Sequence, residues 1–302
     1  MFDMTHSDAL ANTALIFEGG GMRASFTSAV VARLIAEGID FPWVGGISAG
    51  ASCTANYLSR DAGRARESFV DLAADPHFGS WRTWMQGKGR FHAEYIYEQT
   101  GLPGEALPYD WDAYRAHPAQ FAVGAVQADT GRMVYWGRDD VHDLHDLMVR
   151  VRASSTLPVW MPPATIDGHV YFDGALGPTG GFALDAAKAA GFERFVVVLT
   201  RPRNYVKPLG GSVTSAGLRA IFRRYPAIAD AVVKRPLRYN RTRAELFDLE
   251  RSGRAYLFCP EGLTVSNSET DVRKLRHMYE LGSAQIEREL PALREFLELP
   301  AR

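Results

Sequence analysis

Hydrophobic residues follow two different spacings in the first sixty positions of the chain. Residues 14–17 and 41–45 are apolar runs of strand length, whereas apolar residues in 23–37 recur every fourth position on one helical face. Residues 49–58 predict a second helix. The order strand, helix, strand, helix is typical of a parallel sheet with crossover helices, so it predicts an α/β fold.

The same reasoning extends the pattern to the C-terminus. Runs of β-forming residues predict strands at Phe121–Val126, Met133–Trp136, Val170–Phe172, Phe195–Leu199 and Ala255–Cys259. Helical spacing predicts helices at Asp143–Val151, at Ser215–Lys234 apart from Pro226, and within 270–298. We expect one domain, with a core over 13–200 and a basic segment, last strand and C-terminal helices over 201–302.

Residues 76–118 interrupt this regular pattern. They combine many prolines and glycines with many aromatic residues, which predicts an insertion of loops and short helices. Two interpretations remain open. The insertion is either a lid or wall for a ligand, or a packed cap whose aromatic side chains belong to the core.

Composition places the chain among ordinary globular proteins. Hydrophobic residues make up 46% and charged residues 23% of its 302 residues, and no apolar run approaches the ~20 residues of a membrane span. The first twelve residues do not resemble a signal peptide. Cys53 and Cys259 do not form a disulfide framework, and we expect Cys53 to be buried. These features predict a cytoplasmic protein.

The net charge of −1 hides an asymmetry along the chain. Residues 201–243 contain eleven Lys or Arg and one acid, Asp230, so they carry +10 and the remainder carries −11. This segment is either a basic face for phosphate headgroups or an anionic membrane, or a solvated face paired with acids elsewhere. We favour the second interpretation.

A G-x-S-x-G motif at Gly46-Ile47-Ser48-Ala49-Gly50 lies between the second predicted strand and its helix. In a nucleophile elbow of this kind, a strained strand-to-helix turn presents the serine, and the flanking glycines avoid crowding. Ser48 is therefore the candidate nucleophile, with Gly46 and Gly50 supporting it.

The proton acceptor for Ser48 has two candidates. A histidine triad in the order Ser, Asp, His leaves only His277, which sits in a charged helical segment. Asp173 is simpler, because it follows a predicted strand and precedes Gly174, at the strand edge where open α/β sheets place ligands. The Asp-Gly pair taken alone is also typical of a plain turn.

Gly19-Gly20-Gly21 follows the first predicted strand and offers bare peptide N–H groups to an anionic oxygen at a helix start. We expect Arg23 to form a structural salt bridge with an acid such as Glu18. The loop also loosely matches a dinucleotide fingerprint with Asp40 as the ribose-binding acid, but Asp40 follows a helix. A P-loop is excluded because no Lys-Ser or Lys-Thr follows.

His142 and His145 lie among four aspartates on one predicted helix and could hold a metal. We predict an exposed polar face instead, with no metal and no cofactor. The four aspartates are Asp139, Asp140, Asp143 and Asp146.

Three segments together resemble the patatin-like phospholipase family: Glu18–Arg23, Gly46–Gly50 and Asp173–Ala175. The stretch 152–168 before the aspartate is also similar, and the resemblance covers about residues 13–200. Two residues depart from the family pattern: Glu18 stands where many members have Asp, and Ala24 where many have Gly.

The resemblance implies a three-layer α/β/α fold, a mostly parallel sheet and lipid acyl hydrolase activity without a metal. It implies Ser48 as nucleophile and Asp173 as proton acceptor, and an oxyanion hole at Gly19, Gly20 and Gly21. The amides of Gly20 and Gly21 would donate, and Gly19 would shape the turn.

The leading hypothesis is therefore a serine esterase that hydrolyses acyl esters of phospholipids or lysophospholipids. The alternative is a catalytically silent patatin fold that binds lipid or membrane, and a nucleotide-binding oxidoreductase is a third. We expect a lipid ester as substrate and no nucleic acid. Peripheral contact with an anionic inner membrane face through 201–243 stays open as the less favoured interpretation of that segment.

Overall fold

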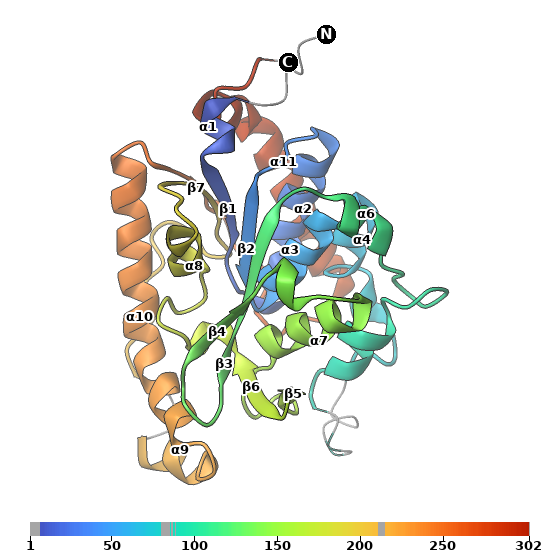
Figure 1. The fold of residues 1–302 in the computed structure, drawn as a ribbon, viewed down its shortest axis with the longest axis vertical. Coiled ribbons are helices and arrows are strands. Elements are labelled where there is room, and N and C mark those ends of the chain that lie inside the picture. Colours follow the sequence, from blue (N-terminus) through green and yellow to red (C-terminus); the bar gives the residue numbers. More distant parts are fainter. Residues whose placement is uncertain (1–6, 80–84, 86, 88, 211–214, 302) are drawn as a thin grey trace.

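The computed structural model describes residues 7–79, 85, 87, 89–210 and 215–301. Its centre is one mixed sheet in which β5-β6-β3-β2-β1-β7-β8 is the order of neighbours and β4 pairs with β3 (Figure 1). The strands are β1 Thr13–Phe17, β2 Trp43–Ile47, β3 Gln120–Gln127, β4 Met133–Trp136, β5 Ala164–Ile166, β6 His169–Asp173, β7 Arg194–Val198 and β8 Ala255–Phe258.

The sheet is parallel in its centre and antiparallel at one end. Neighbours among β1, β2, β3, β7 and β8 run parallel. Strands β4 and β6 pair antiparallel with β3, and β5 pairs antiparallel with β6. The predicted hairpin is formed by β3 and β4, and the mostly parallel α/β sheet is confirmed.

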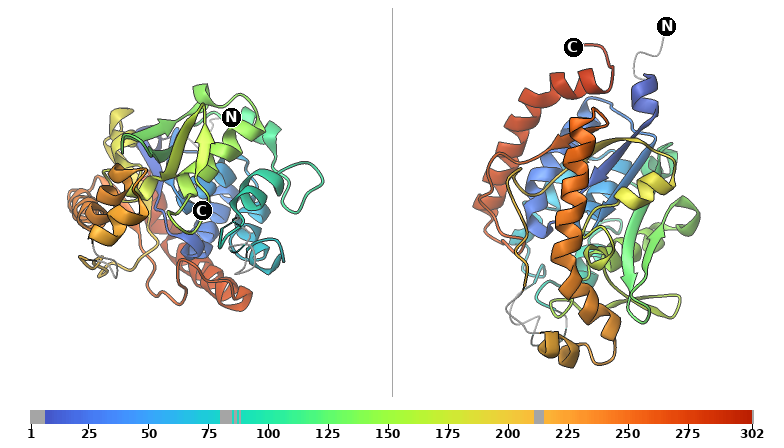
Figure 2. Two further views of the ribbon diagram at one scale, coloured as in Figure 1. Left: turned by 90° about the horizontal axis from the view of Figure 1, so that it is seen from below. Right: turned by 90° about the vertical axis from the view of Figure 1, so that its left-hand side faces the viewer.

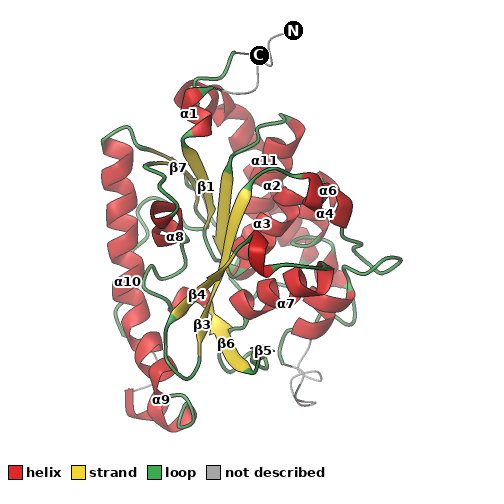
Figure 3. Cartoon of the chain, in the orientation of Figure 1, coloured by secondary structure: helices red, strands yellow, loops and turns green. Residues whose placement is uncertain are grey.

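Helices cover both faces of the sheet, which makes three layers (Figures 1 and 3). The α-helices are α1 Asp8–Ala11, α2 Ala24–Ala36, α3 Ala49–Leu58, α4 Ala62–Glu67, α6 Trp111–Ala116, α7 Leu144–Ser155, α8 Leu184–Ala189, α9 Ser215–Ile221, α10 Pro226–Arg251 and α11 Val272–Phe296. Helices α2, α3, α7 and α11 pack on one face, and α8 and α10 on the other (Figure 2).

The alternation along β1 explains the layers. Leu15 and Phe17 join the core cluster under α2, α3 and α11, whereas Ala14 and Ile16 join the cluster under α8 and α10. A strand that is buried on both faces is apolar at every position, as the sequence of residues 14–17 is. The predicted β-α-β-α unit over 14–58 is confirmed.

The described part of the 76–118 insertion is a packed cap. Phe78 and Phe91 are buried with ring centroids 5.6 Å apart, and the Tyr109 hydroxyl donates a hydrogen bond to the Ala55 carbonyl at 2.8 Å. Residues 80–84, 86 and 88 lie outside the described residues. Whether the cap also moves as a lid stays a prediction.

Helix α10 is longer than the sequence predicted. We expected this helical segment to end at Lys234, before Pro236, but α10 continues to Arg251 with Pro236 inside it. A proline in a helix removes one backbone hydrogen bond. Burial of Tyr239, Leu246 and other residues of α10 on the sheet offsets that loss, because tertiary packing supplies most helical stability. Among the described residues, no helix has both the length and the apolarity of a membrane span.

Candidate active site

Ser48 stands in a strained turn between β2 and α3. Its backbone has φ 57° and ψ −127°, a region that costs energy for any residue except glycine. A Cβ on Gly46 would overlap the Gly50 carbonyl, and one on Gly50 would overlap the carbonyl of Phe17. The elbow therefore requires both glycines, as the sequence predicted, and it places Ser48 at the start of α3.

The elbow is held from a second element, α7. The N–H of Ser48 donates to Ser154 Oγ at 2.9 Å, and Ser154 Oγ donates to the Gly124 carbonyl on β3 at 2.7 Å. Sequence reasoning did not single out Ser154, although it lies in the 152–168 stretch that resembles the family. Nothing in the spacing of the chain indicates that its hydroxyl meets residue 48.

Asp173 comes to the elbow along an antiparallel strand. We expected it at the edge where parallel strands end, but β6 enters from beyond the end of β3 and stops with Asp173 opposite Ala125. The neighbouring Gly124 is paired with Ile47, the residue before the serine. A Cβ on Gly174 would overlap the Gly124 carbonyl, so only glycine allows this close approach.

The two side chains meet across 125 positions of sequence. The Ser48 hydroxyl lies near enough to the Asp173 carboxyl to lower its pKa by hydrogen bonding. Asp173 Oδ2 is buried without a hydrogen-bond partner among the described residues. Its other oxygen, Oδ1, accepts the N–H of Ala175 at 2.8 Å. One carboxylate oxygen is thus anchored and the other is free to accept a proton.

Burial dominates the electrostatics of Asp173. The carboxyl is 1% exposed, and desolvation raises its pKa, while Arg235 and the N–H of Ala175 act in the opposite direction. A raised pKa makes a carboxylate a better base near neutral pH. The environment therefore suits the role that the sequence predicted.

The three glycines of the loop differ in the hydrogen bonds of their backbone N–H groups. The N–H of Gly19 donates to the Gly181 carbonyl at 2.9 Å, so it is not available to a substrate, and a Cβ there would come within 2.8 Å of the Ile47 carbonyl. The N–H groups of Gly20 and Gly21 have no hydrogen-bond partner in the described part of the chain. The resemblance implies the same division, with Gly19 shaping the turn and the amides of Gly20 and Gly21 left bare.

The predicted salt bridge between Glu18 and Arg23 does not form. Glu18 Oε2 accepts the N–H of Thr200 at 2.6 Å, and Oε1 accepts the Tyr239 hydroxyl at 2.7 Å. Arg23 is 7% exposed and makes no ion pair with a described carboxylate. Burial, followed by repulsion from Arg201, lowers its pKa to about 10.

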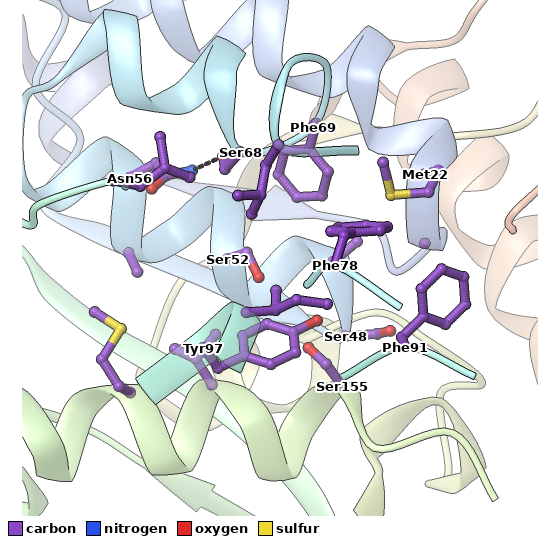
Figure 4. Close-up of a pocket in the computed structure, with 18 of the residues that line it drawn as sticks. Met22, Ser48, Ser52, Asn56, Ser68, Phe69, Phe78, Phe91, Tyr97 and Ser155 are labelled. Carbon is purple, nitrogen blue, oxygen red and sulfur yellow. Dashed lines mark hydrogen bonds between the residues drawn. The ribbon is translucent and has the colours of Figure 1, made fainter. Parts of the chain in front are cut away.

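An apolar cavity of about 90 Å³ opens at Ser48 (Figure 4). Apolar side chains of the glycine loop, of residues 69–72, of the cap and of α7 make most of its wall. They include Met22, Phe69, Leu72, Phe78, Phe91, Ile96, Leu107, Met148 and Val151. Its polar members include Ser52 and Tyr97 near Ser48, with Asn56 farther along α3 and Ser68 at the C-terminal end of α4 (Figure 4).

A second, larger cavity of about 470 Å³ opens at Asp173. It shares Phe91 and Leu157 with the first cavity, and otherwise differs in chemistry. Its wall includes Tyr205, Lys207, Arg235, Asn267 and Ser268. The Ser48–Asp173 pair thus lies where two cavities meet, and the second cavity adds Lys207 and Arg235 to a wall that is otherwise largely apolar.

The histidine triad, the dinucleotide site and the metal site find less support than the Ser48–Asp173 pair. His277 is exposed on α11, and no histidine of the described residues lines either cavity. Asp40 forms an ion pair with Arg60 at 2.7 Å. Asp146, in the cluster with Asp143 and His145, already accepts from Arg150 at 3.0 Å, which fits the predicted polar face. Cys53 is buried, as predicted, and burial raises the pKa of its thiol.

A known family model matches the part of the chain that contains Ser48 and Asp173. Residues 15–183 match the model of the patatin-like phospholipase family, which is more than half of the chain, and the chain belongs to that family. Membership implies an acyl hydrolase that acts on lipids. Residues 225–298 match a domain of unknown function (DUF6363).

The crystal structure of VipD from Legionella pneumophila is similar, with a TM-score of 0.47 and 13% identity over 93% of this chain and 67% of VipD. No curated protein matches the sequence.

Proposed function

We propose that the protein is a serine esterase that hydrolyses acyl ester bonds of phospholipids or lysophospholipids through a Ser48–Asp173 dyad. The observation that carries the proposal is the free, buried Asp173 Oδ2 beside a strained Ser48, with two unpartnered amides nearby. Strained turns, desolvated bases and bare donors are each costly, and they occur together where chemistry uses them.

The first half of the reaction acylates the enzyme. Asp173 Oδ2 takes the hydroxyl proton as Ser48 Oγ bonds to the ester carbonyl carbon, and the N–H groups of Gly20 and Gly21 stabilise the resulting oxyanion. The bond from that carbon to the alcohol oxygen then breaks. The departing alcohol or lysolipid takes the proton from Asp173.

The second half releases the acyl group. Water gives its proton to Asp173 and its oxygen to the acyl carbon. The bond to Ser48 Oγ then breaks, and the proton returns to the serine. The fatty acid leaves, and Ser48 and Asp173 regain their starting protonation states.

A fluorophosphonate probe tests the activated serine directly. Wild-type protein should be labelled at Ser48, Ser48→Ala should not be labelled, and Ser52→Ala should still be labelled. Ser52 is the matched control because it lies one turn along α3 in the same cavity. Hydrolysis of p-nitrophenyl butyrate should follow the labelling.

The same experiment separates the alternative function. Absence of labelling together with tight binding to anionic vesicles would replace the hydrolase by a lipid-binding protein with the patatin fold. Peripheral contact with an anionic membrane through 201–243 is compatible with either proposal.

A further inference from the structure

The basic segment 201–243 is only partly neutralised. Arg203 pairs with Glu250 and Arg219 with Asp230, as the solvated-face interpretation expected. Arg201, Lys207 and Arg235 form no ion pair with any carboxylate in the described residues. These three cations, with Arg23 from the glycine loop, form what we call the cation cluster.

The cation cluster is built into the fold. The backbone of Lys207 is clamped by Asn240 on α10, with hydrogen bonds of 2.8 and 2.9 Å to its N–H and carbonyl. The Arg201 guanidinium lies 4.3 Å from the centre of the Tyr205 ring, and the Lys207 ammonium lies 4.8 Å from that of Tyr239. Side chains held in this way are already ordered before a ligand arrives.

The cluster has more positive charge than its surroundings balance. Burial lowers the pKa of Lys207 to about 8, and repulsion from Arg235, Arg23 and Arg201 adds to the effect. The nearby acids are Glu18 and Asp173, so four cations face two carboxylates. Both oxygens of Glu18 are already occupied by Thr200 and Tyr239. An anion bound among these cations would relieve their repulsion.

The place of these cations relative to Ser48 indicates which anion they would bind. Lys207 and Arg235 line the second cavity together with Asp173, whereas the acyl cavity begins at Ser48. An ester whose carbonyl carbon sits at Ser48 and whose chain fills the apolar cavity must direct its alcohol part into the second cavity. A phosphate on that alcohol would meet an ammonium and a guanidinium, the groups that bind phosphate best in proteins.

We propose that the second cavity is a headgroup subsite that binds the phosphate of lipids with a net negative headgroup, through Lys207 and Arg235 with Arg201 behind them. The inference rests on the proposed function, because it assigns the leaving-group side of that reaction. It places the choice of substrate class in residues outside the segment that matches the patatin-like phospholipase model.

Monomeric short-chain lipids test the subsite without a membrane surface. We would measure kcat/KM for dihexanoyl phosphatidylglycerol and dihexanoyl phosphatidylcholine below their micellar concentrations. The wild type should prefer the anionic lipid. In Lys207→Gln that preference should fall about tenfold to a hundredfold, the range for one lost hydrogen bond to a charged group. In Arg201→Gln, which removes a charge behind the cavity wall, the preference should fall by less. Lys234→Gln removes one exposed charge from α10 and should keep the wild-type preference.

Soluble inhibitors separate a lipid headgroup from a free phosphate ion. Glycerol 3-phosphate should inhibit p-nitrophenyl butyrate hydrolysis by the wild type, glycerol should not, and Lys207→Gln should lose the inhibition. Inhibition by inorganic phosphate at equal strength would show that the cavity binds the free ion and not a headgroup, and would overturn the assignment.

The outcomes distinguish the two proposals. Hydrolysis that depends on Ser48 but shows equal rates for the two lipids, or an unchanged preference in Lys207→Gln, would overturn the subsite and leave the esterase intact. If no ester is hydrolysed, the esterase fails and the subsite falls with it.

Discussion

The two cavities that meet at Ser48 and Asp173 differ in chemistry and in origin. The acyl cavity is narrow, mostly apolar and lined only by residues between Gly21 and Met161. The second cavity is larger, carries Lys207 and Arg235, and takes more than half of its wall from residues 205–268. The first lies wholly inside the segment that matches the family, and the second lies largely outside it.

This difference suggests how the chain divides its tasks. In the proposed function, the family segment supplies the nucleophile, the base and an apolar wall that any long acyl chain could use. The later segment lies over the other side of the same dyad and supplies charge. Acyl hydrolysis and headgroup selection can then vary independently, because separate parts of the sequence control them.

The largest expected effect comes from a substitution that removes the proposed base and leaves both cavities in place. Asp173→Asn should lower kcat for p-nitrophenyl butyrate about 10⁴-fold, since the amide cannot take the serine proton. Lipid binding should persist, measured with a fluorescent lysolipid. Wild-type kcat/KM should rise with pH through the raised pKa of Asp173, because the base must be ionised. Retained turnover in the amide variant would show that another group is the base.

The same variant should be more stable than the wild type at neutral pH. A buried carboxyl whose folded pKa is raised loses stability as pH rises from its unfolded pKa through its folded pKa. Asparagine removes that cost and keeps the acceptor for the N–H of Ala175. Thermal unfolding at pH 7 should show a higher Tm, by about 2 °C or more, and the gain should shrink at pH 4.

Blocking the acyl cavity should change chain-length preference and leave the headgroup preference. Ser52→Leu places a larger side chain one turn beyond the nucleophile, and an overpacked site costs about 1–3 kcal/mol. We expect kcat/KM for a p-nitrophenyl dodecanoate to fall about tenfold to a hundredfold relative to the acetate. Ala189→Leu, exposed on α8, is the matched control. An equal loss for both esters would mean that the chain does not enter this cavity.

The second cavity should respond to mildly alkaline pH. Lys207 is charged below its pKa of about 8 and neutral above it, and Arg235, Arg23, Arg201 and Glu18 face it. Preference for the anionic lipid should therefore fall by a few fold between pH 7 and 9. Lys207→Gln should show a flat preference over that range, and a parallel decline in the variant would assign the titration to another group.

The smallest expected effect tests the bond that joins the two segments. Tyr239→Phe removes the hydroxyl that donates to Glu18 Oε1 and leaves the ring in place. A hydrogen bond to a charged group contributes about 1.5–3 kcal/mol to stability. Urea unfolding should show a loss of this size, with kcat reduced only a few fold. Loss of all activity would indicate that Tyr239 acts directly in the reaction.

Hydrophobic periodicity and glycine spacing were sufficient to predict the core elements and the turn at Ser48. The strand at 14–17, the helix with Leu34 and the turn at Ser48 all follow from residues close together in sequence, so periodicity and glycine spacing predict them. The antiparallel entry of β6 could not be predicted, because strand direction depends on how β3, β5 and β6 pair.

Contacts between residues far apart in the chain could not be predicted from the sequence. Ser154 beneath the elbow, Thr200 and Tyr239 on Glu18, and Asn240 on Lys207 each join residues tens of positions apart or more. The same limit explains Arg23: proximity in sequence suggested Glu18 as its partner, but the fold uses Glu18 elsewhere. The continuation of α10 past Pro236 also depends on burial against the sheet and not on local propensity.

Through Glu18, the segment that matches the patatin-like phospholipase model depends on residues beyond the end of that match. Its carboxylate begins the glycine loop, and in the described part of the chain its two oxygens accept hydrogen bonds from Thr200 and Tyr239, both beyond residue 183. A fragment cut at that boundary would leave this carboxylate without either partner, directly beside the glycine loop. Recombination between relatives would therefore have to exchange position 18 and the tyrosine of α10 together.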